Sequence, residues 1–208
     1  MKINKKLLST ILAGIVSFSI VGCVSDSNNS KQNSNSKTVE TKKDKNETKK
    51  TDSTLIKDLN LEQTQGPIKV KITEVEKAKL HLSEKDFNDL SINYSDLTNK
   101  GKDLNIVAIY LEIENTSDKS VDIYPTQGTL ALNTKEQIED RMIFPGSEDL
   151  SGEYLGNTLK KGVVAFVVDS NLKDINSIQY KFEASEEQGD SDEDINFYEF
   201  LFNINLNK

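Results

Sequence analysis

Residues 104–113 read LNIVAIYLEI, and this stretch decides the fold class. The odd-numbered residues from Val107 to Ile113 are all aliphatic, and the even-numbered residues from Ile106 to Tyr110 are apolar as well. Alternation with a period of two is typical of a β-strand, and apolar residues on both faces predict a central strand. The stretch therefore predicts a domain built around a buried sheet.

Shorter runs with the same period lie on both sides of this stretch. Turn-forming residues such as Asn115–Lys119 and Tyr124-Pro125 separate them. The alternation slips at Glu74-Val75, which predicts a β-bulge, and Ser83 followed by acidic residues predicts the start of one short helix. We therefore expect residues 66–208 to form an all-β domain, an antiparallel sandwich of about 7–9 strands. The expected strands cover residues 68–72, 80–82, 104–113, 121–123, 130–132, 137–143, 163–168, 178–182 and 198–206.

The amino terminus has the pattern of an export signal. Three lysines within residues 1–6 precede the apolar run Leu7–Val21, which is shorter than the roughly 20 residues that span a membrane. We expect residues 1–22 to be a signal peptide.

Ile20-Val21-Gly22-Cys23 resembles the lipobox of bacterial lipoproteins. The resemblance implies that the Cys23 thiol receives a diacylglyceryl group and that the chain is cut before Cys23. A plain signal peptide or an uncleaved anchor is the alternative. Two acyl chains anchor a protein stably. The Lys, Asn and Ile content is similar to that of low-GC Gram-positive bacteria, which would place the protein on the outer face of the cytoplasmic membrane.

Residues 23–65 are predicted to be a disordered polar linker. Between Val24 and Ser53 the only aliphatic residues are Val24 and Val39, so this part cannot bury enough apolar surface to offset the entropy of ordering. Its lysines could contact anionic lipid or wall polymer, although plain solvation is the simpler interpretation.

The domain resembles a known superfamily in the order of three segments. They are residues 107–125 (VAIYLEIENTSDKSVDIYP), 129–132 (TLAL) and 159–169 (LKKGVVAFVVD). This order is similar to that of immunoglobulin-like extracellular domains of unknown function, a superfamily named for a secreted immunoprotective antigen. Lys161 stands where many members have proline. The resemblance implies an immunoglobulin-like sandwich, exported and without an assigned catalytic activity.

Charge and residue content argue against several functions. Residues 54–208 hold 16 Lys and Arg against 29 Asp and Glu, and such an acidic domain disfavours nucleic-acid binding. His81 is the only histidine and Cys23 the only cysteine. A catalytic triad, a zinc site or a copper site needs more such residues, so we expect neither an enzyme nor a bound cofactor.

A calcium site is the one metal site to weigh. Asp190, Asp192 and Asp194 have the opening spacing of an EF-hand loop, but Ile195 and Leu201 stand where that loop requires Gly and Glu. Weak calcium binding and a solvated acidic loop both remain open.

The expected function is a non-catalytic interaction module on the cell surface, which binds a protein or cell-wall partner through loops or an edge strand. Candidate loops are 115–119, 144–156 and 185–194. Tyr154 and Leu155 could form an exposed apolar contact or plug the end of the sandwich. The alternative function is a protease inhibitor that presents Phe144-Pro145-Gly146.

Overall fold

The computed structural model describes residues 50–93, 100–139, 150–187 and 195–207. The chain divides into two compact units, residues 1–48 and 49–208, and every described residue lies in the second. Within these residues the chain forms ten strands, the helix α1 (Glu84–Asn93) and the 3-10 turn η4 (Pro125–Gln127).

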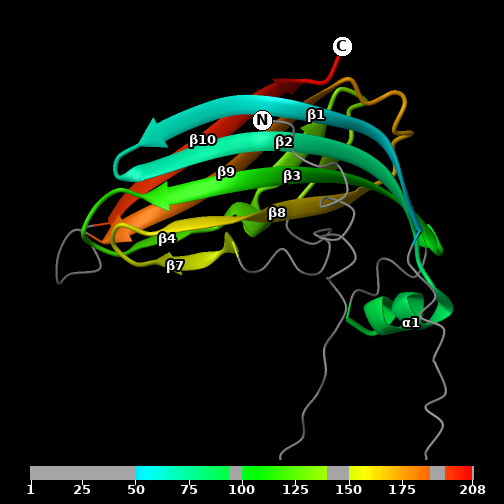
Figure 1. The fold of residues 1–208 in the computed structure, drawn as a ribbon, viewed down its shortest axis with the longest axis horizontal. Helices are drawn as coiled ribbons and strands as arrows, with labels where there is room; N and C mark the ends of the chain where they lie inside the picture. The colour runs from blue at the N-terminus through cyan, green and yellow to red at the C-terminus, as the bar shows by residue number, and fades with distance from the viewer. Residues whose placement is uncertain (1–49, 94–99, 140–149, 188–194, 208) are drawn as a thin grey trace, which may run out of the picture. The chain divides into compact units, whose positions relative to one another are not determined.

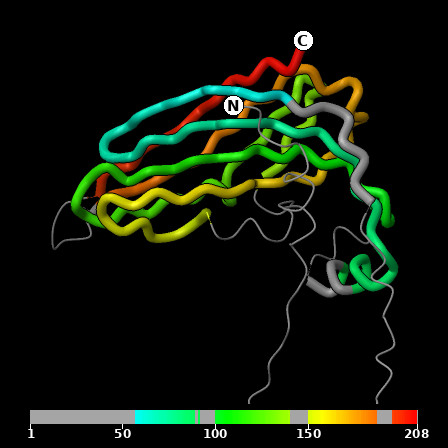
Figure 2. Tube along the Cα trace, in the orientation of Figure 1, coloured from blue at the N-terminus to red at the C-terminus, as the bar shows by residue number. Residues whose placement is uncertain are grey.

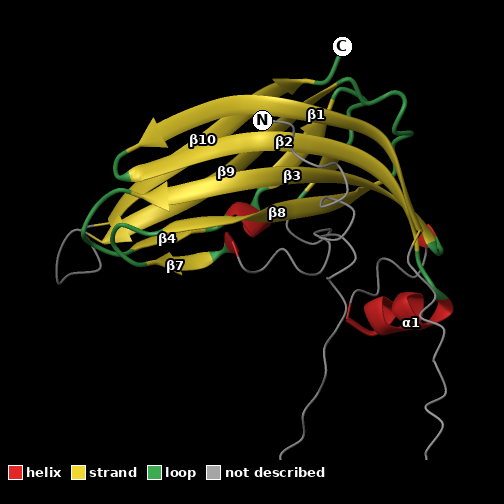
Figure 3. Cartoon of the chain, in the orientation of Figure 1, coloured by secondary structure: helices red, strands yellow, loops and turns green. Residues whose placement is uncertain are grey.

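Two antiparallel sheets pack face to face as a sandwich (Figures 1 and 3). All strand pairs are antiparallel. The four-stranded sheet has the order β1-β2-β3-β8, with strands β1 (Lys50–Gln65), β2 (Ile68–His81), β3 (Asp103–Asn115) and β8 (Leu159–Val168). The six-stranded sheet contains β4 (Val121–Ile123), β5 (Thr129–Leu132), β6 (Gln137–Ile138), β7 (Gly152–Tyr154), β9 (Ser177–Glu187) and β10 (Ile195–Asn205).

Strand β9 organises the six-stranded sheet. It pairs with β10 along one edge and with both β5 and β4 along the other, so these two short strands lie end to end beside it. Strand β6 pairs with β5, and β7 pairs with β4. The predicted all-β antiparallel sandwich is confirmed, with β3 as a central strand between β2 and β8.

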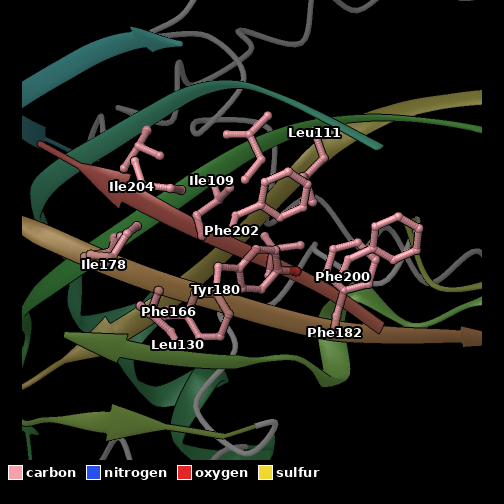
Figure 4. Packing of buried hydrophobic residues seen from close by; sticks show 14 of the residues in the cluster. Ile109, Leu111, Leu130, Phe166, Ile178, Tyr180, Phe182, Phe200, Phe202 and Ile204 are labelled. Atoms are coloured by element: carbon pink, nitrogen blue, oxygen red, sulfur yellow. The ribbon is translucent and has the colours of Figure 1, made fainter. Parts of the chain in front are cut away.

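The interior lies between the sheets and is formed by alternate residues of their strands. Its aromatic row is continuous: the ring of Phe166 meets Tyr180 edge to face at 5.8 Å, Tyr180 lies 5.3 Å from Phe182, and Phe182 stacks on Phe200 at 5.2 Å (Figure 4). The hydroxyl of Tyr180 donates to the Pro125 carbonyl at 2.5 Å, which pairs its only polar group. This row joins β8, β9 and β10 across the core.

Two local predictions agree with the structure. The register between β2 and β3 shifts between Ile72 and Glu74, so Thr73 is the extra residue of a bulge. Helix α1 begins after Ser83, whose Oγ accepts a hydrogen bond from the backbone N–H of Asp86 at 3.1 Å. This is the N-cap geometry that the sequence predicts.

The prediction that residues 50–65 belong to a disordered linker is wrong. They form β1, which pairs with β2 from Lys50↔His81 to Gln65↔Ile68. Gly66 has φ +52°, and together with Pro67 it makes a two-residue hairpin turn. Because proline keeps φ negative, the turn is of type II′, which suits the twist of a hairpin. Leu59 and Leu61 pack against the interior, so this mostly polar strand still contributes to the core.

Side chains of β1 also bind the neighbouring edge strand β10. Gln63 donates from Nε2 to the Leu201 carbonyl at 2.6 Å, Gln65 donates to the Glu199 carbonyl, and Lys57 donates to the Asn205 carbonyl at 2.6 Å. These bonds occupy carbonyls that an edge strand would otherwise leave open for pairing with another chain. Polar side chains of a strand that was predicted to be linker therefore close one side of the sandwich.

The sandwich has two ends, which we name by what lies there. The linker end is where β1 begins at Lys50, β2 ends at His81 and β3 begins at Asp103. The turn end holds the Gly66-Pro67 turn and the turns that follow β3 and β7. The tube in Figure 2 shows that these turns gather at one end of the strands.

Candidate binding surface

Two connections between the sheets lie side by side at the turn end. Residues 116–120 lead from β3 to β4, and residues 155–158 lead from β7 to β8, so both cross from one sheet to the other. They are hydrogen-bonded to each other, since the Asn157 N–H donates to the Ser117 carbonyl at 2.7 Å and the Asn115 N–H donates to the Thr158 carbonyl at 2.9 Å. Thr116 also donates from its N–H to the Pro67 carbonyl of the β1–β2 turn at 2.8 Å.

Asn115 is the hub of these connections. Its side chain is fully buried, and Nδ2 donates to the carbonyls of Lys119 at 2.6 Å, Tyr154 at 3.1 Å and Leu155 at 3.2 Å. Its Oδ1 accepts hydrogen bonds from the N–H and the Oγ–H of Ser117. A buried amide can satisfy both donor and acceptor groups of nearby backbone, and here one amide holds both connections.

The turn from Leu155 to Thr158 is held tightly. A side chain at Gly156 would place its Cβ 2.4 Å from the Asp118 carbonyl oxygen, so only glycine fits against that backbone. Asn157 has φ +56°, a conformation that Asn tolerates better than most residues. Thr158 closes the turn by donating from Oγ1 to the Leu155 carbonyl at 2.6 Å. The turn is therefore ordered before any partner arrives, which lowers the entropy cost of binding.

Apolar side chains are exposed on both sides of this turn. Leu155 is 60% exposed and Leu159 is 51% exposed. Phe197, at the start of β10 on the same end of the sandwich, is 75% exposed. Among the residues that the structure describes, Leu201 is the one other large apolar side chain with comparable exposure. We call Leu155, Leu159 and the turn between them the apolar turn.

Tyr154 belongs to the interior, which agrees with the expectation that it plugs the end of the sandwich and not with an exposed partner contact. It is fully buried, and its hydroxyl donates to the Leu150 carbonyl at 2.7 Å. Burial raises the pKa of Tyr154 well above its usual range. The Lys160 ammonium lies 4.2 Å from the centre of its ring, a cation–π geometry. Strand alternation explains the difference: Tyr154 faces inward and Leu155, the next residue, faces outward.

Most of the other predicted site residues lie outside the described residues. These are Cys23, Phe144 and Pro145, and the three aspartates Asp190, Asp192 and Asp194. Lipidation, inhibition through Phe144-Pro145-Gly146 and calcium binding therefore stay predictions. Within residues 50–93, 100–139, 150–187 and 195–207, no three His, Cys, Asp or Glu side chains converge as a metal site would require.

His81 lies at the linker end, opposite Asp103 on β3. Its Nδ1 is 2.6 Å from Asp103 Oδ1, and this hydrogen bond is the main reason why the pKa of Asp103 is lowered. Lys79 adds a second positive charge, with its Nζ 3.8 Å from Asp103 Oδ2. A directly opposed pair of this kind is an ordinary cross-strand contact.

An acidic group lies on the outer face of the four-stranded sheet. The Tyr110 hydroxyl donates to Glu76 Oε2 at 3.1 Å, and Glu76 is buried. Glu74 has one buried carboxylate oxygen, Oε1, without a hydrogen-bond partner. Burial, followed by the charges of Asp58 and Glu76, raises the pKa of Glu74.

The sequence offers Leu155 as a possible exposed apolar contact, but Leu159 is not among the predicted site residues. The sequence does contain a sign that Leu159 is exposed, because it precedes Lys160-Lys161 and occupies an outward position in the alternation of β8.

None of the helices within the described residues has the length and apolarity required to cross a membrane.

No protein-family model matches the chain. One curated relative is the SPbeta prophage-derived uncharacterized lipoprotein YonS of Bacillus subtilis (strain 168), 32% identical over 80 residues. That match covers 38% of this chain and 39% of the relative, so the chain spans well under half the length of the protein it matches.

Two solved structures show a limited likeness in shape. A functionally unknown protein from Listeria monocytogenes EGD-e has a TM-score of 0.47 at 11% identity, covering 74% of this chain and 87% of that one. The yjhA protein of Bacillus subtilis has a TM-score of 0.40 at 11% identity, covering 60% of this chain and 80% of that one.

Proposed function

We propose that this chain is an exported lipoprotein, anchored through a lipid on Cys23, whose immunoglobulin-like sandwich is a non-catalytic binding module. The single observation that carries the proposal is the separation of the two ends of the sandwich. The chain from the anchor enters at Lys50, at the linker end, while the apolar turn lies at the opposite end. An anchored domain with this polarity presents the apolar turn away from the attachment point.

Two sequence observations support the anchor. The signal pattern of residues 1–22 leads directly to Ile20-Val21-Gly22-Cys23, and the relative YonS bears the name lipoprotein. Between Cys23 and β1 lie residues 24–49, whose r.m.s. reach as a flexible chain is about 5–6 Å × √n, roughly 25–30 Å. That reach lifts the domain clear of the lipid head groups on the outer face of the cytoplasmic membrane.

The chemistry of the apolar turn supports binding and not catalysis. Leu155 and Leu159 carry no group that transfers a proton or attacks a substrate, but they offer apolar surface on a preorganised turn. Exposed apolar side chains that are grouped together mark contact sites more often than scattered ones do. The partner is a protein or a wall component with an apolar surface.

The anchor is tested by metabolic labelling with an alkyne fatty acid in cells that express the full chain. The expected result is label on the wild type and none on Cys23→Ala, which is then released from the membrane fraction. Retention of Cys23→Ala on membranes at the wild-type level contradicts the anchor.

The binding module is tested by photocrosslinking on intact cells. A benzoyl-phenylalanine is placed at Leu155 or Leu159, and at Lys173 as a matched control, because Lys173 is exposed at the linker end. We expect a discrete adduct from the two positions of the apolar turn and at least about tenfold less from Lys173. Equal adduct yields from all three positions contradict a contact at the turn end.

A further inference from the structure

The outer face of the six-stranded sheet adjoins the apolar turn. Along β9 and β10, buried residues of the interior alternate with outward residues, and outward residues such as Gln179, Glu183 and Asn203 are exposed. This face is therefore not covered by any other part of the chain that the structure describes.

One row of residues crosses this face at the turn end. Glu153 of β7 lies opposite Asp122 of β4. Ser185 of β9 lies opposite Asp122 on one side and opposite Phe197 of β10 on the other. Residues that lie opposite one another share a face of the sheet, and Leu155, two residues after Glu153, points to the same side. The row therefore connects the apolar turn with the exposed side chain of Phe197.

Two apolar side chains are exposed along β10 on this face. Phe197 is 75% exposed and Leu201 is 41% exposed. They are four residues apart, so about 14 Å of strand separates them at roughly 3.4 Å per residue. Glu199 lies between them and is exposed as well. Strand β10 therefore presents an alternation of apolar and acidic side chains.

The other charges of this face are mostly negative. Asp122 and Glu153 are neighbours in the row, and Glu183 lies directly opposite Glu199. Like charges directly opposite each other destabilise a sheet. Among the described outward residues of the six-stranded sheet, Lys181 is the one base, and its Nζ lies 2.6 Å from Glu199 Oε2. One lysine therefore leaves most of the negative charge uncompensated.

A second base lies at the border of the face. Lys160 of β8 donates to the Glu153 carbonyl at 3.1 Å, and its ammonium stays over the ring of Tyr154. With Lys160 included, four carboxylates still outnumber two ammonium groups. We call the following residues the acidic face: Asp122, Glu153, Glu183, Phe197, Glu199 and Leu201.

Charge complementarity decides among the partners that the proposed function leaves open. Anionic lipid head groups and anionic wall polymers are repelled by carboxylates. A second copy of the chain that docked through the same face would place the same carboxylates against each other. A basic protein segment gains attraction from the acids and burial from the exposed apolar side chains.

The dimensions of the surface suit a short segment. Four strands about 4.8 Å apart, from β7 to β10, make it roughly 14 Å wide, and the six residue steps from the level of Leu155 to that of Leu201 make it about 20 Å long. About six extended residues cover that length. The area is well below the roughly 800 Å² that each partner contributes to a standard interface.

We propose that the acidic face is the docking surface for a basic segment of a partner protein, in which Lys or Arg residues stand among apolar ones. The apolar groups of the segment contact Phe197, Leu201 and Leu155, and its cations pair with Glu183 and its acidic neighbours. This inference rests on the proposed function, because the acidic face continues from the apolar turn, and it names the chemistry of the partner.

Photocrosslinking from the full chain on intact cells tests the position of the contact. A benzoyl-phenylalanine at Phe197 should give an adduct with the same protein as one at Leu155. Mass spectrometry of that adduct should find more Lys and Arg than Asp and Glu in the attached peptide of the partner. An acidic or neutral peptide, a dimer of the chain, or an adduct from Leu155 with none from Phe197 overturns the inference.

Neutralising the acids tests the charge. Asp122→Asn, Glu183→Gln and Glu199→Gln together should lower the adduct yield from Leu155 by about tenfold, since each exposed ion pair contributes modestly. The matched control neutralises three exposed acids elsewhere, Glu84→Gln, Glu139→Gln and Asp174→Asn, and should keep the wild-type yield.

Two further measurements keep this result separate from a folding defect. Chemical denaturation should find the neutralised variant at least as stable as the wild type, because the opposed pair Glu183 and Glu199 is removed. Glu183→Gln alone keeps the ion pair between Lys181 and Glu199 and should still lower the yield by about two- to threefold.

The outcomes also separate this inference from the proposed function. A wild-type yield from Leu155 in the neutralised variant overturns the basic partner and leaves the binding module intact. Failure of the module itself is seen before any charge is changed, as equal yields from Leu155, Leu159 and Lys173, and the inference then fails with it.

Discussion

The two ends of the sandwich are closed in different ways. At the linker end, polar groups bind backbone: Lys77 is buried and its ammonium donates to the carbonyls of Leu172 at 2.7 Å and Ile175 at 2.5 Å. At the turn end, Asn115 binds three carbonyls and fixes two connections, yet Leu155 and Leu159 remain exposed beside it. Each end uses a buried polar side chain for order, but the turn end also leaves apolar side chains exposed.

The largest expected effect tests the hub of the turn end. Asn115→Ala removes the buried amide that donates to the Lys119, Tyr154 and Leu155 carbonyls and accepts from Ser117, so we expect the free energy of unfolding to fall by about 3 kcal/mol. Chemical denaturation of the domain measures this. Asn203→Ala, at an exposed position of β10, serves as the control and should stay within about 0.5 kcal/mol of the wild type. Equal losses in the two variants would show that Asn115 does not organise the turn end.

The corresponding residue at the linker end is Lys77. Lys77→Met keeps the length of the side chain but leaves the Leu172 and Ile175 carbonyls unpaired, which should cost about 2 kcal/mol. The loss is reduced because burial disfavours the charged form of Lys77, which also lowers its pKa, and methionine avoids this cost of burying a charge. Denaturation of Lys77→Met beside Lys79→Met, two residues further along β2 and partly exposed, makes the comparison. No difference between them would argue that the linker end needs no buried cation.

Tyr154 separates packing from hydrogen bonding at the turn end. Tyr154→Phe keeps the buried ring under Lys160 and removes only the hydrogen bond to the Leu150 carbonyl. We expect a loss of about 1 kcal/mol in unfolding free energy, with crosslinking from Leu155 unchanged. A variant that folds stably but loses the crosslink would mean that Tyr154 acts in binding as well as in packing.

A pH dependence is expected at the linker end. The pKa of Asp103 is lowered in the folded state, chiefly by the hydrogen bond to His81, so its stabilising effect is present above the unfolded value of 3.8. That effect is lost as the pH falls through the lowered folded pKa, because the unfolded chain then binds the proton more readily. Asp103→Asn should therefore have a lower thermal midpoint than the wild type at pH 7, with the gap closing at low pH. A gap that is constant with pH would exclude the His81 contact as its cause.

The smallest expected effect on stability is the most informative for function. Leu155→Ser and Leu159→Ser change exposed side chains, so the free energy of unfolding should stay within about 0.5 kcal/mol of the wild type. Binding through the apolar turn should nevertheless weaken, which competition with the photocrosslinked adduct on cells would measure. Serine variants that compete as well as the native chain would remove Leu155 and Leu159 from the contact.

The amino-acid sequence by itself determined the strand content of this protein. Period-two alternation identifies β3 and β8–β10 because a strand with a buried face needs apolar residues at every second position. The bulge at Thr73 and the cap at Ser83 are also readable, since both depend on residues that are neighbours in the chain. The predicted export signal depends on a local pattern in the same way.

Only the tertiary structure decided what the polar and mixed segments do. The sequence predicts a linker over residues 23–65, but residues 50–65 form β1, because β2 supplies backbone partners and β10 supplies carbonyls for Gln63 and Lys57. Likewise, the sequence leaves open whether Leu155 is an exposed contact or plugs the end of the sandwich, and the two connections that meet around Asn115 decide it. The physical reason is that pairing and burial depend on groups distant in sequence, whose positions no local pattern contains.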